Sequence, residues 1–384
     1  MNIPVYITSL ETISSLGSSN DEIWNNYMLP KHFISKVDLD NGVTFGSYLP
    51  NDIKEELENL RSSSSYLKNV DPTVLYAIKA SRLAFKDAKW DKGEDIGINI
   101  GSSRGATQLF EKYYKNFLET GSAGVLSSPS TTLGNISSWV SQDIQSHGPD
   151  ISHSVTCSTG LHALLNGVAW LNAGMASKFM VGGSEAALTP FTIAQMKAMK
   201  IYAKEDLDYP CRALDLGKTK NSMVLGEAAG IACLELHPET YLAKIAGVGY
   251  STEKLKHSVS ISANAECFQR SMKMAVGNIP LDEIDVIVMH APGTIKGDMA
   301  EVNAVRKVFG ENIPALTSNK WKVGHTFGAS GILSLQLAIM MLQHEKFIPV
   351  PFAQTRPFPK HFRNILINAV GFGGNAVSIL VNKG

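Results

Sequence analysis

Short apolar runs and longer apolar runs of helical spacing alternate along the chain. Residues 3–8 and 96–100 are short, apolar and β-branched, which predicts strands. Asp71 precedes a proline, as a helix N-cap often does, and apolar residues then recur at helical spacing, so we predict a helix over about 72–88. The polar stretch 17–69 predicts loops and a short helix.

From residue 152 onward, the elements follow one another closely. Residues 154–156 read as the end of a strand, and 157–160 as a turn of small residues. Residues 161–173 are apolar on nearly all sides, which is typical of a buried helix. The next strand is predicted at 178–181, where the glycines of 182–185 end it.

The C-terminal part of the chain returns to the same plan. Its segments are a strand at 284–289, a short run at 315–318, a glycine-bounded turn at 324–331, an apolar helix at 332–342 and a last strand at 364–370 closed by 371–375. Alternating strands and helices indicate an α/β protein. The repeated plan indicates a duplication, which we place as two halves, residues 1–235 and 236–384.

Composition narrows the class of protein. With 35 basic and 35 acidic residues, the chain lacks the charge excess by which proteins bind nucleic acid or anionic membranes. The N-terminus has no signal-peptide pattern, and the run 332–342 is too short to span a bilayer. The four cysteines form no CxxC pair, so we expect no metal site, no disulfide framework and a reducing cytoplasmic location.

Cys157 is the first candidate for chemistry. It follows a predicted strand and opens a helix, where unpaired backbone N–H groups carry partial positive charge. Such positions stabilise thiolates and can bind an oxyanion, so we expect a lowered pKa here. The alternative is an ordinary buried cysteine, as we expect for Cys211, Cys233 and Cys267.

Two histidines occupy similar places. His290 comes directly after the strand 284–289, and His325 lies in the glycine-bounded turn five residues after Lys320. Ends of parallel strands are where α/β proteins place catalytic groups. Each histidine taken alone has a purely structural alternative. Together with Cys157 they predict a nucleophile with base or electrostatic partners in one cleft.

Five ordered motifs show that the chain resembles the β-ketoacyl-acyl-carrier-protein synthases, condensing enzymes of the thiolase superfamily. The resemblance covers nearly the whole chain. The motifs are VTCSTGLHA at 155–163, GEAAG at 226–230, HAPGTIKGD at 290–298 with Glu301, GHTFGASG at 324–331 after Lys320, and GFGGN at 371–375.

The resemblance implies a five-layered αβαβα thiolase fold, a decarboxylating condensation and a role for each motif. Cys157 would hold the acyl chain, while His290 and His325 would stabilise the enolate formed as carbon dioxide leaves. The backbone N–H groups of Cys157 and Phe372 would form the oxyanion hole. Lys320 would be the fourth catalytic residue, which tunes His325 and the local charge, and Glu301 and Gly373 would support this network. No metal or other cofactor is required.

The implied partner is an acyl carrier protein bearing acyl and malonyl phosphopantetheine thioesters. The resemblance further implies a homodimer, or a heterodimer with a related subunit. Ala291 and Pro292 depart from the HGTGT motif, 215–225 lacks the DRDGF signature, and the last loop lacks a threonine. These departures favour a specialised synthase of a polyene, pigment, polyketide or fatty-acid pathway.

Three other functions deserve comparison. A thiolase would use a second, late cysteine, but none follows Cys267. A non-catalytic or weakly active chain-length partner of another ketosynthase would be expected to lack Cys157, but the altered loops leave this alternative open. The GFGG run at 371–374 lies too near the C-terminus for the helix and strand of a dinucleotide-binding fingerprint.

Overall fold

The computed structural model describes residues 4–39, 42–133, 135–205, 207–254, 261–352 and 358–383. Its N-terminal part holds β1 (Val5–Ile13), α1 (Asn20–Met28), β2 (Ser35–Leu39), β3 (Gly42–Gly46), α2 (Asn51–Ser62), α3 (Pro72–Asp87), β4 (Ile96–Gly101), α4 (Thr107–Thr120), α5 (Asn135–Ile144), β5 (Asp150–Ile151), the 3-10 turn η1 (Thr156–Ser158), α6 (Thr159–Asn172), β6 (Lys178–Glu185), α7 (Pro190–Ala198) and β7 (Ala228–Glu235).

The C-terminal part holds β8 (Ala243–Thr252), α8 (Glu266–Val276), the 3-10 turn η2 (Leu281–Glu283), β9 (Ile284–Val288), α9 (Ile295–Phe309), β10 (Ala315–Thr317), α10 (Lys320–Val323), the 3-10 turn η3 (Phe327–Ala329), α11 (Ser330–His344), β11 (Asn364–Gly371) and β12 (Asn375–Asn382). The sequence correctly predicted α3 with its N-cap Asp71, whose side chain accepts the N–H of Thr73, and the apolar helices α6 and α11.

Sheet topology repeats between the two parts. The ten-stranded sheet has the order β10-β9-β11-β12-β8-β1-β7-β6-β4-β5. Read outward from the centre, β1-β7-β6-β4-β5 matches β8-β12-β11-β9-β10 strand for strand, including which neighbours run parallel. β1 and β8 join the two parts as an antiparallel pair. The topology is that of a duplicated α/β fold, while the division at residue 235 stays a prediction.

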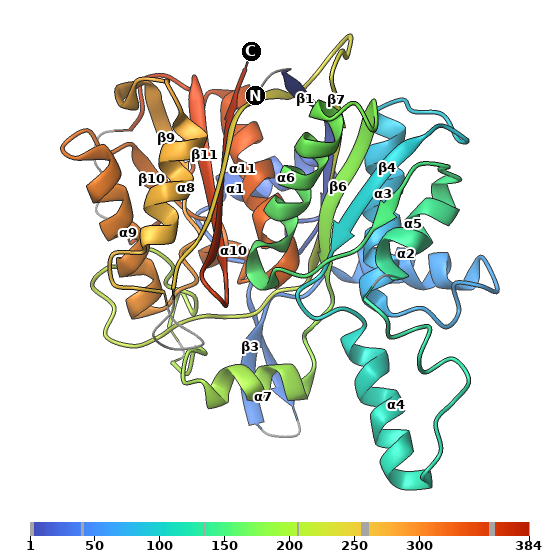
Figure 1. Ribbon diagram of the computed structural model, residues 1–384. Coiled ribbons are helices and arrows are strands. Elements are labelled where there is room, and N and C mark those ends of the chain that lie inside the picture. Colours follow the sequence, from blue (N-terminus) through green and yellow to red (C-terminus); the bar gives the residue numbers. More distant parts are fainter. Residues whose placement is uncertain are drawn as a thin grey trace.

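Five layers follow from how the helices cover the sheet (Figure 1). Helices α8 and α9 lie on one side, α3 and α5 on the other, and α6 and α11 lie between the two parts of the sheet. Both helices of the central layer are apolar. Helix α11 is buried on all sides from Ser330 to Leu342, whereas α6 leaves one side partly exposed at Ala169. The predicted αβαβα arrangement is therefore confirmed.

The central helices approach each other at two equivalent glycines. A Cβ atom on Gly160 would lie 2.8 Å from the Ile332 side chain and 2.9 Å from the Gly328 carbonyl oxygen. A Cβ atom on Gly331 would lie 2.6 Å from the Leu161 side chain. Only glycine permits this contact, and it brings the N-termini of α6 and α11 together.

Some predicted boundaries were wrong. The stretch 17–69 contains α1, α2 and the β2–β3 hairpin rather than loops and one short helix. Residues 154–156 are not a strand end, since β5 stops at Ile151 and Thr156 begins a 3-10 turn. Strand β6 continues through 182–185, and β11 is not the last strand because β12 pairs with it as a hairpin.

One stretch of the described chain, Phe327–His344, is long and apolar enough to cross a membrane, and 89% of it is buried inside the protein.

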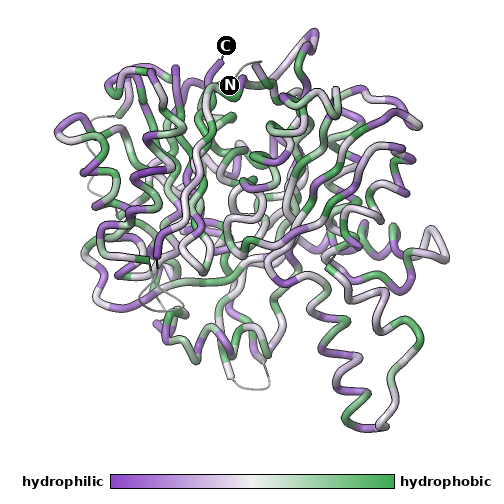
Figure 2. The backbone as a smooth tube through the Cα atoms, viewed as in Figure 1, coloured by the Kyte–Doolittle hydropathy of each residue, from purple (hydrophilic) through white to green (hydrophobic). Residues whose placement is uncertain are grey.

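Helix α4 projects away from the body of the molecule (Figure 1). Hydrophobic and hydrophilic segments alternate along α4 in Figure 2, and Phe110, Tyr114 and Leu118 are exposed there. Helix α4 is therefore the element that projects furthest from the body, and it carries an exposed apolar and aromatic face.

Candidate active site

Cys157 lies in a strained turn directly before helix α6. Thr156, which opens the turn, has a φ of 49°, a left-handed conformation that is uncommon outside glycine. The Ser158 hydroxyl lies 2.9 Å from the carbonyl of Val155 and 3.2 Å from that of Asn375, so it ties the turn to the β11–β12 hairpin. A Cβ atom on Gly371 would lie 2.1 Å from Thr156 Oγ1, so glycine is required for this close packing.

The thiol of Cys157 is neutral at rest. Burial, with a smaller contribution from the Glu185 carboxylate, raises its pKa to about 12, although the Lys320 ammonium acts in the opposite direction. The sequence led us to expect a lowered pKa at the start of a helix, and that expectation was wrong in direction. Removal from water outweighs favourable charges in a side chain that is only 6% exposed.

His290 follows β9 in a loop whose backbone N–H groups donate to the carboxylate of Glu301. Glu301 of α9 accepts the backbone N–H groups of His290, at 2.9 Å, and Ala291, at 2.8 Å. Asn368 of β11 donates to the same carboxylate at 3.2 Å. Ala291 has a φ of 26°, and the paired acceptor oxygens compensate for this strained backbone.

His325 lies just before η3, with its ring edge-on to that of His290. The ring centroids are 5.2 Å apart and the planes cross at 80°. The backbone N–H of Phe327 donates to Nδ1 of His325 at 3.2 Å, which leaves Nε2 as the protonated nitrogen. Burial lowers the pKa of both histidines well below the ordinary value, and Lys320 lowers them further. Both rings are therefore neutral, and Nε2–H of His325 can donate.

Lys320 is the buried cation of the site. It is the first residue of α10 and only 1% exposed. Burial lowers the pKa of Lys320 and raises that of Glu301, and the attraction between the two opposes both shifts. Lys320 also acts electrostatically on Cys157 and on both histidines, so one charge influences all three groups.

A single cavity of about 550 Å³ brings the candidate groups together. Its lining includes Cys157, His290, His325, Glu301 and Phe372. Lys320 is buried and is not among the residues that line the cavity. Gly373, with a φ of 100°, lies in the hairpin turn beside Phe372. The remaining walls are mainly apolar and include Met196, Met199, Ile201, Met223, Phe268 and Phe327.

Glu185 is a site residue that the sequence did not reveal. It is fully buried at the end of β6 and accepts N–H groups of Ser103, at 2.8 Å, and of Gly328, at 3.0 Å. Burial raises its pKa to about 7. An acidic residue that closes an apolar strand was the available signal, and we had read it as the turn after the strand.

Comparison with known proteins identifies the family of the chain. Residues 2–239 match the model of the β-ketoacyl synthase N-terminal domain, and residues 242–352 match the C-terminal domain. The chain therefore belongs to the β-ketoacyl synthase family of condensing, acyltransferase-type enzymes. Curated relatives include the 3-oxoacyl-[acyl-carrier-protein] synthase 2 of Staphylococcus aureus strain MRSA252, 27% identical over 100% of this chain and 99% of the relative. That of Coxiella burnetii is 24% identical over 99% and 98%.

Solved structures share the fold across the whole chain. The ishigamide ketosynthase/chain length factor has a TM-score of 0.88 at 19% identity, with 100% of both chains covered. A β-ketoacyl synthase from Burkholderia phymatum has a TM-score of 0.86 at 22% identity, again with 100% of both covered. A ketosynthase from Xenorhabdus doucetiae, solved in complex with its chain length factor, has a TM-score of 0.81 at 20% identity, covering 100% of this chain and 98% of that one. The thiolase-like fold expected from the motifs is confirmed.

Proposed function

We propose that this chain is a 3-oxoacyl-carrier synthase that joins an acyl group on Cys157 to a two-carbon unit from a malonyl thioester. One observation carries the proposal. A single cavity holds a thiol at the start of α6 and two neutral imidazoles with ring centroids 5.2 Å apart. A nucleophile beside two fixed donors suits acyl transfer followed by enolate formation.

In the first step, the Cys157 sulfur attacks the carbonyl carbon of an acyl-carrier thioester. The bond from that carbon to the carrier sulfur breaks, and the thiol proton ends on the carrier sulfur. The backbone N–H groups of Cys157 and Phe372 would bind the developing oxyanion. Within the described chain, neither N–H donates to another backbone group, which supports that role.

In the second step, the malonyl C–C bond breaks, carbon dioxide leaves, and the electron pair passes into an enolate. The N–H of His325 Nε2, with His290 beside it, would stabilise the enolate oxygen. The enolate carbon then attacks the acyl carbonyl on Cys157, and the carbon–sulfur bond breaks to release a 3-oxoacyl-carrier. Cys157 leaves as a thiolate and takes up one proton from solvent, which restores the thiol. Decarboxylation supplies the carbanion, so the proposal includes no cofactor or metal. Neutral imidazoles suit this role, because a buried ring can donate its N–H without carrying a positive charge that burial would disfavour.

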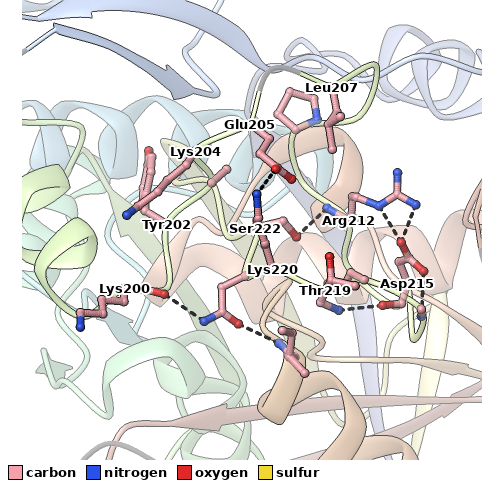
Figure 3. A pocket seen from close by; sticks show the side chains of 16 residues that line it. Lys200, Tyr202, Lys204, Glu205, Leu207, Arg212, Asp215, Thr219, Lys220 and Ser222 are labelled. Atoms are coloured by element: carbon pink, nitrogen blue, oxygen red, sulfur yellow. Dashed lines mark hydrogen bonds and ion pairs between the residues drawn. The ribbon is translucent and has the colours of Figure 1, made fainter.

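A second cavity supports an acidic carrier protein as the partner (Figure 3). It has a volume of about 610 Å³ and shares Asn221 and Ile295 with the catalytic cavity. Lys200 and Lys204 line it beside the Arg212–Asp215 and Lys220–Glu205 ion pairs, whereas the Lys218 side chain is 3% exposed and pairs with Asp298 instead. Among the solved relatives is a type II polyketide carrier protein in complex with its ketosynthase. We place the phosphate of a carrier arm at this basic opening.

We further propose a dimer, either of two identical chains or with a related subunit. The exposed aromatic face of α4, with Phe110, Tyr114 and Phe117, is the surface that supports it.

We also propose a cytoplasmic location, consistent with the carrier-dependent relatives. The pathway that fits best is a specialised fatty-acid or polyketide pathway, given the departures at Ala291 and Pro292 from the family motif.

Mass spectrometry of the intact protein tests the nucleophile. Incubation with acyl-carrier should add one acyl mass to the protein, and peptide mapping should place it on Cys157. The Cys157→Ala variant should take no acyl group and should lose condensation by about a thousandfold or more. Condensation by Cys157→Ala at an unaltered rate would remove the nucleophile from the proposal. The Cys233→Ala variant is the matched control, since Cys233 is a buried cysteine that does not line the cavity.

A non-catalytic chain-length partner is the second candidate. The raised pKa of Cys157 favours it, because a neutral buried thiol is a poor nucleophile until substrate binds. The same incubation separates the two. A protein that never acylates alone, but raises product length when mixed with an active ketosynthase, would be a partner rather than a synthase.

A further inference from the structure

The loop that carries His290 is shaped by two carboxylates of the helix that follows it. Asp298 and Glu301 are three residues apart on α9 and therefore lie on one face. Glu301 accepts the N–H groups of His290 and Ala291, whereas Asp298 accepts that of Gly293 at 3.0 Å. The loop thus depends on two buried acceptors, one at each end.

A segment distant in sequence holds the other side of the same loop. The N–H and hydroxyl of Ser222 both donate to the carbonyl of Gly293, at 2.9 and 3.0 Å. Asn221 Oδ1 accepts the N–H of Ile295 at 2.9 Å. Ser222 is itself fixed, since its hydroxyl accepts the N–H of Arg212 at 3.0 Å, and Figure 3 shows this pair beside the Arg212–Asp215 ion pair.

Gly293 is held too tightly for another residue. Its φ is 87°, and a Cβ atom would lie 3.3 Å from the backbone of Ser222 and 3.4 Å from Cys211 Sγ. Both its N–H and its carbonyl group are hydrogen-bonded to neighbours. Any shift of Asp298 or Ser222 therefore moves the backbone three residues from His290.

Lys218 is the counter-ion of this arrangement. Its ammonium lies 2.6 Å from Asp298 Oδ2, and the two side chains are 3% and 1% exposed. The same oxygen accepts the N–H of Leu214 at 2.9 Å, and Lys218 also donates to the carbonyl of Asp215 at 3.0 Å. Without Lys218 the Asp298 carboxylate would be a buried and uncompensated charge, which proteins tolerate poorly.

We propose that Lys218 is a positioning residue for His290, acting through Asp298 and Gly293. The inference rests on the proposed function, because it assigns Lys218 to the decarboxylation step in which His290 takes part. His290 is edge-on to His325 in the structure, and a displacement of about 1 Å at a reacting group can lower a rate by about a hundredfold. Acyl transfer to Cys157 depends on η1 and the β11–β12 hairpin instead, which Lys218 does not contact.

Three variants test the role. Lys218→Met should lower kcat for decarboxylation of saturating malonyl-carrier by about tenfold to a hundredfold, with Cys157 acylation within about twofold of the unaltered rate. Lys218→Arg keeps the charge and should restore most of the decarboxylation. The double variant Lys218→Met with Asp298→Asn removes both charges and should also be more active than Lys218→Met alone. Lys383→Met, which removes an exposed ion pair with Glu345, is the control and should change neither rate.

A purely structural role for Lys218 would give a different result. Both rates would then fall together, in proportion to the folded fraction, and the proposal would be overturned. It would also be overturned if Lys218→Met decarboxylated normally.

A second measurement does not depend on activity. Diethyl pyrocarbonate should modify the buried His290 several-fold faster in Lys218→Met than in the unaltered protein, as read by peptide mass spectrometry. The exposed His237 should react equally in both. An unchanged rate at His290 would contradict the positioning role. Loss of all activity in the unaltered protein would instead count against the proposed function alone, since the modification rate would still report on the loop.

Discussion

The two parts of the molecule build the same turn and place different residues in it. In the N-terminal part, Thr156 opens η1 with a φ of 49° and is followed by Cys157; in the C-terminal part, Phe327 opens η3 with a φ of 42° and is followed by Gly328. Each turn leads into a central helix. The duplicated frame therefore offers two equivalent turn positions, and the neighbours decide which of them can hold a side chain. At Gly328 a Cβ atom would lie 2.7 Å from the Ser103 nitrogen, so no side chain fits.

The buried carboxylates of the two parts differ in the same way. Glu301 serves its own part, since it shapes the loop of His290 and Ala291. Glu185 reaches across, because it accepts N–H groups from Ser103 of the N-terminal part and from Gly328 of the C-terminal part. Glu301 fixes the loop of His290, whereas Glu185 joins the loop after β4 to η3, so the buried carboxylate has a different structural role in each part.

The strongest test of the comparison is to remove the two histidines that line the cavity, both of which lie in the C-terminal part. His290→Ala and His325→Ala should each lower malonyl-carrier decarboxylation by about a hundredfold to a thousandfold, since each removes a fixed donor to the enolate. Acylation of Cys157, in the other part, should persist and is measured on the same samples by intact mass. Near-normal decarboxylation in both variants would show that neither histidine stabilises the enolate. His237→Ala, at an exposed position, is the control.

The steric difference between the two turns predicts a stability effect. Gly328→Ala should lower the free energy of unfolding by about 1–3 kcal/mol, because the new methyl group meets Ser103 and the Glu185 carboxylate at 2.7 and 3.0 Å. Chemical denaturation of both proteins measures it. Gly124→Ala, where the nearest atom is 3.9 Å away, should change stability by less than about 0.5 kcal/mol. Equal effects at the two glycines would show that the turn at Gly328 can accept a side chain.

The smallest effect concerns the charge that the C-terminal part supplies to the N-terminal thiol. The pKa of Cys157 is about 12, because burial raises it more than the Lys320 charge lowers it. Lys320→Met should raise that pKa further, so less thiolate is present and alkylation of Cys157 by iodoacetamide at pH 7.5 should slow several-fold. In the unaltered protein the rate should keep rising through pH 9, where an ordinary thiol levels off. Peptide mass spectrometry follows the rates; a faster reaction in Lys320→Met would reverse the assigned sign.

Much of the fold could be predicted from the chain because apolar runs locate strand and helix interiors. Cys157 and His290 lie near the ends of such runs, which is why both were found. Effects that arise only on packing were missed: burial reversed the expected pKa shift of Cys157, and Glu185 joined two distant loops. Strand β12 was missed because only the hairpin of Gly373 and Gly374, both with positive φ, lets the chain turn back so soon. The catalytic roles of the site residues stay predictions until the variants above are measured.

The contact at Gly160 and Gly331 also limits how such an enzyme can be engineered. Each glycine accepts the other helix where a single methyl group would collide with Ile332 or Leu161. Exchanging one part for that of a relative would succeed only if the relative also has a glycine at the equivalent position of its central helix. These two positions are therefore the first to inspect when chimaeric chains are assembled, ahead of any residue that touches substrate.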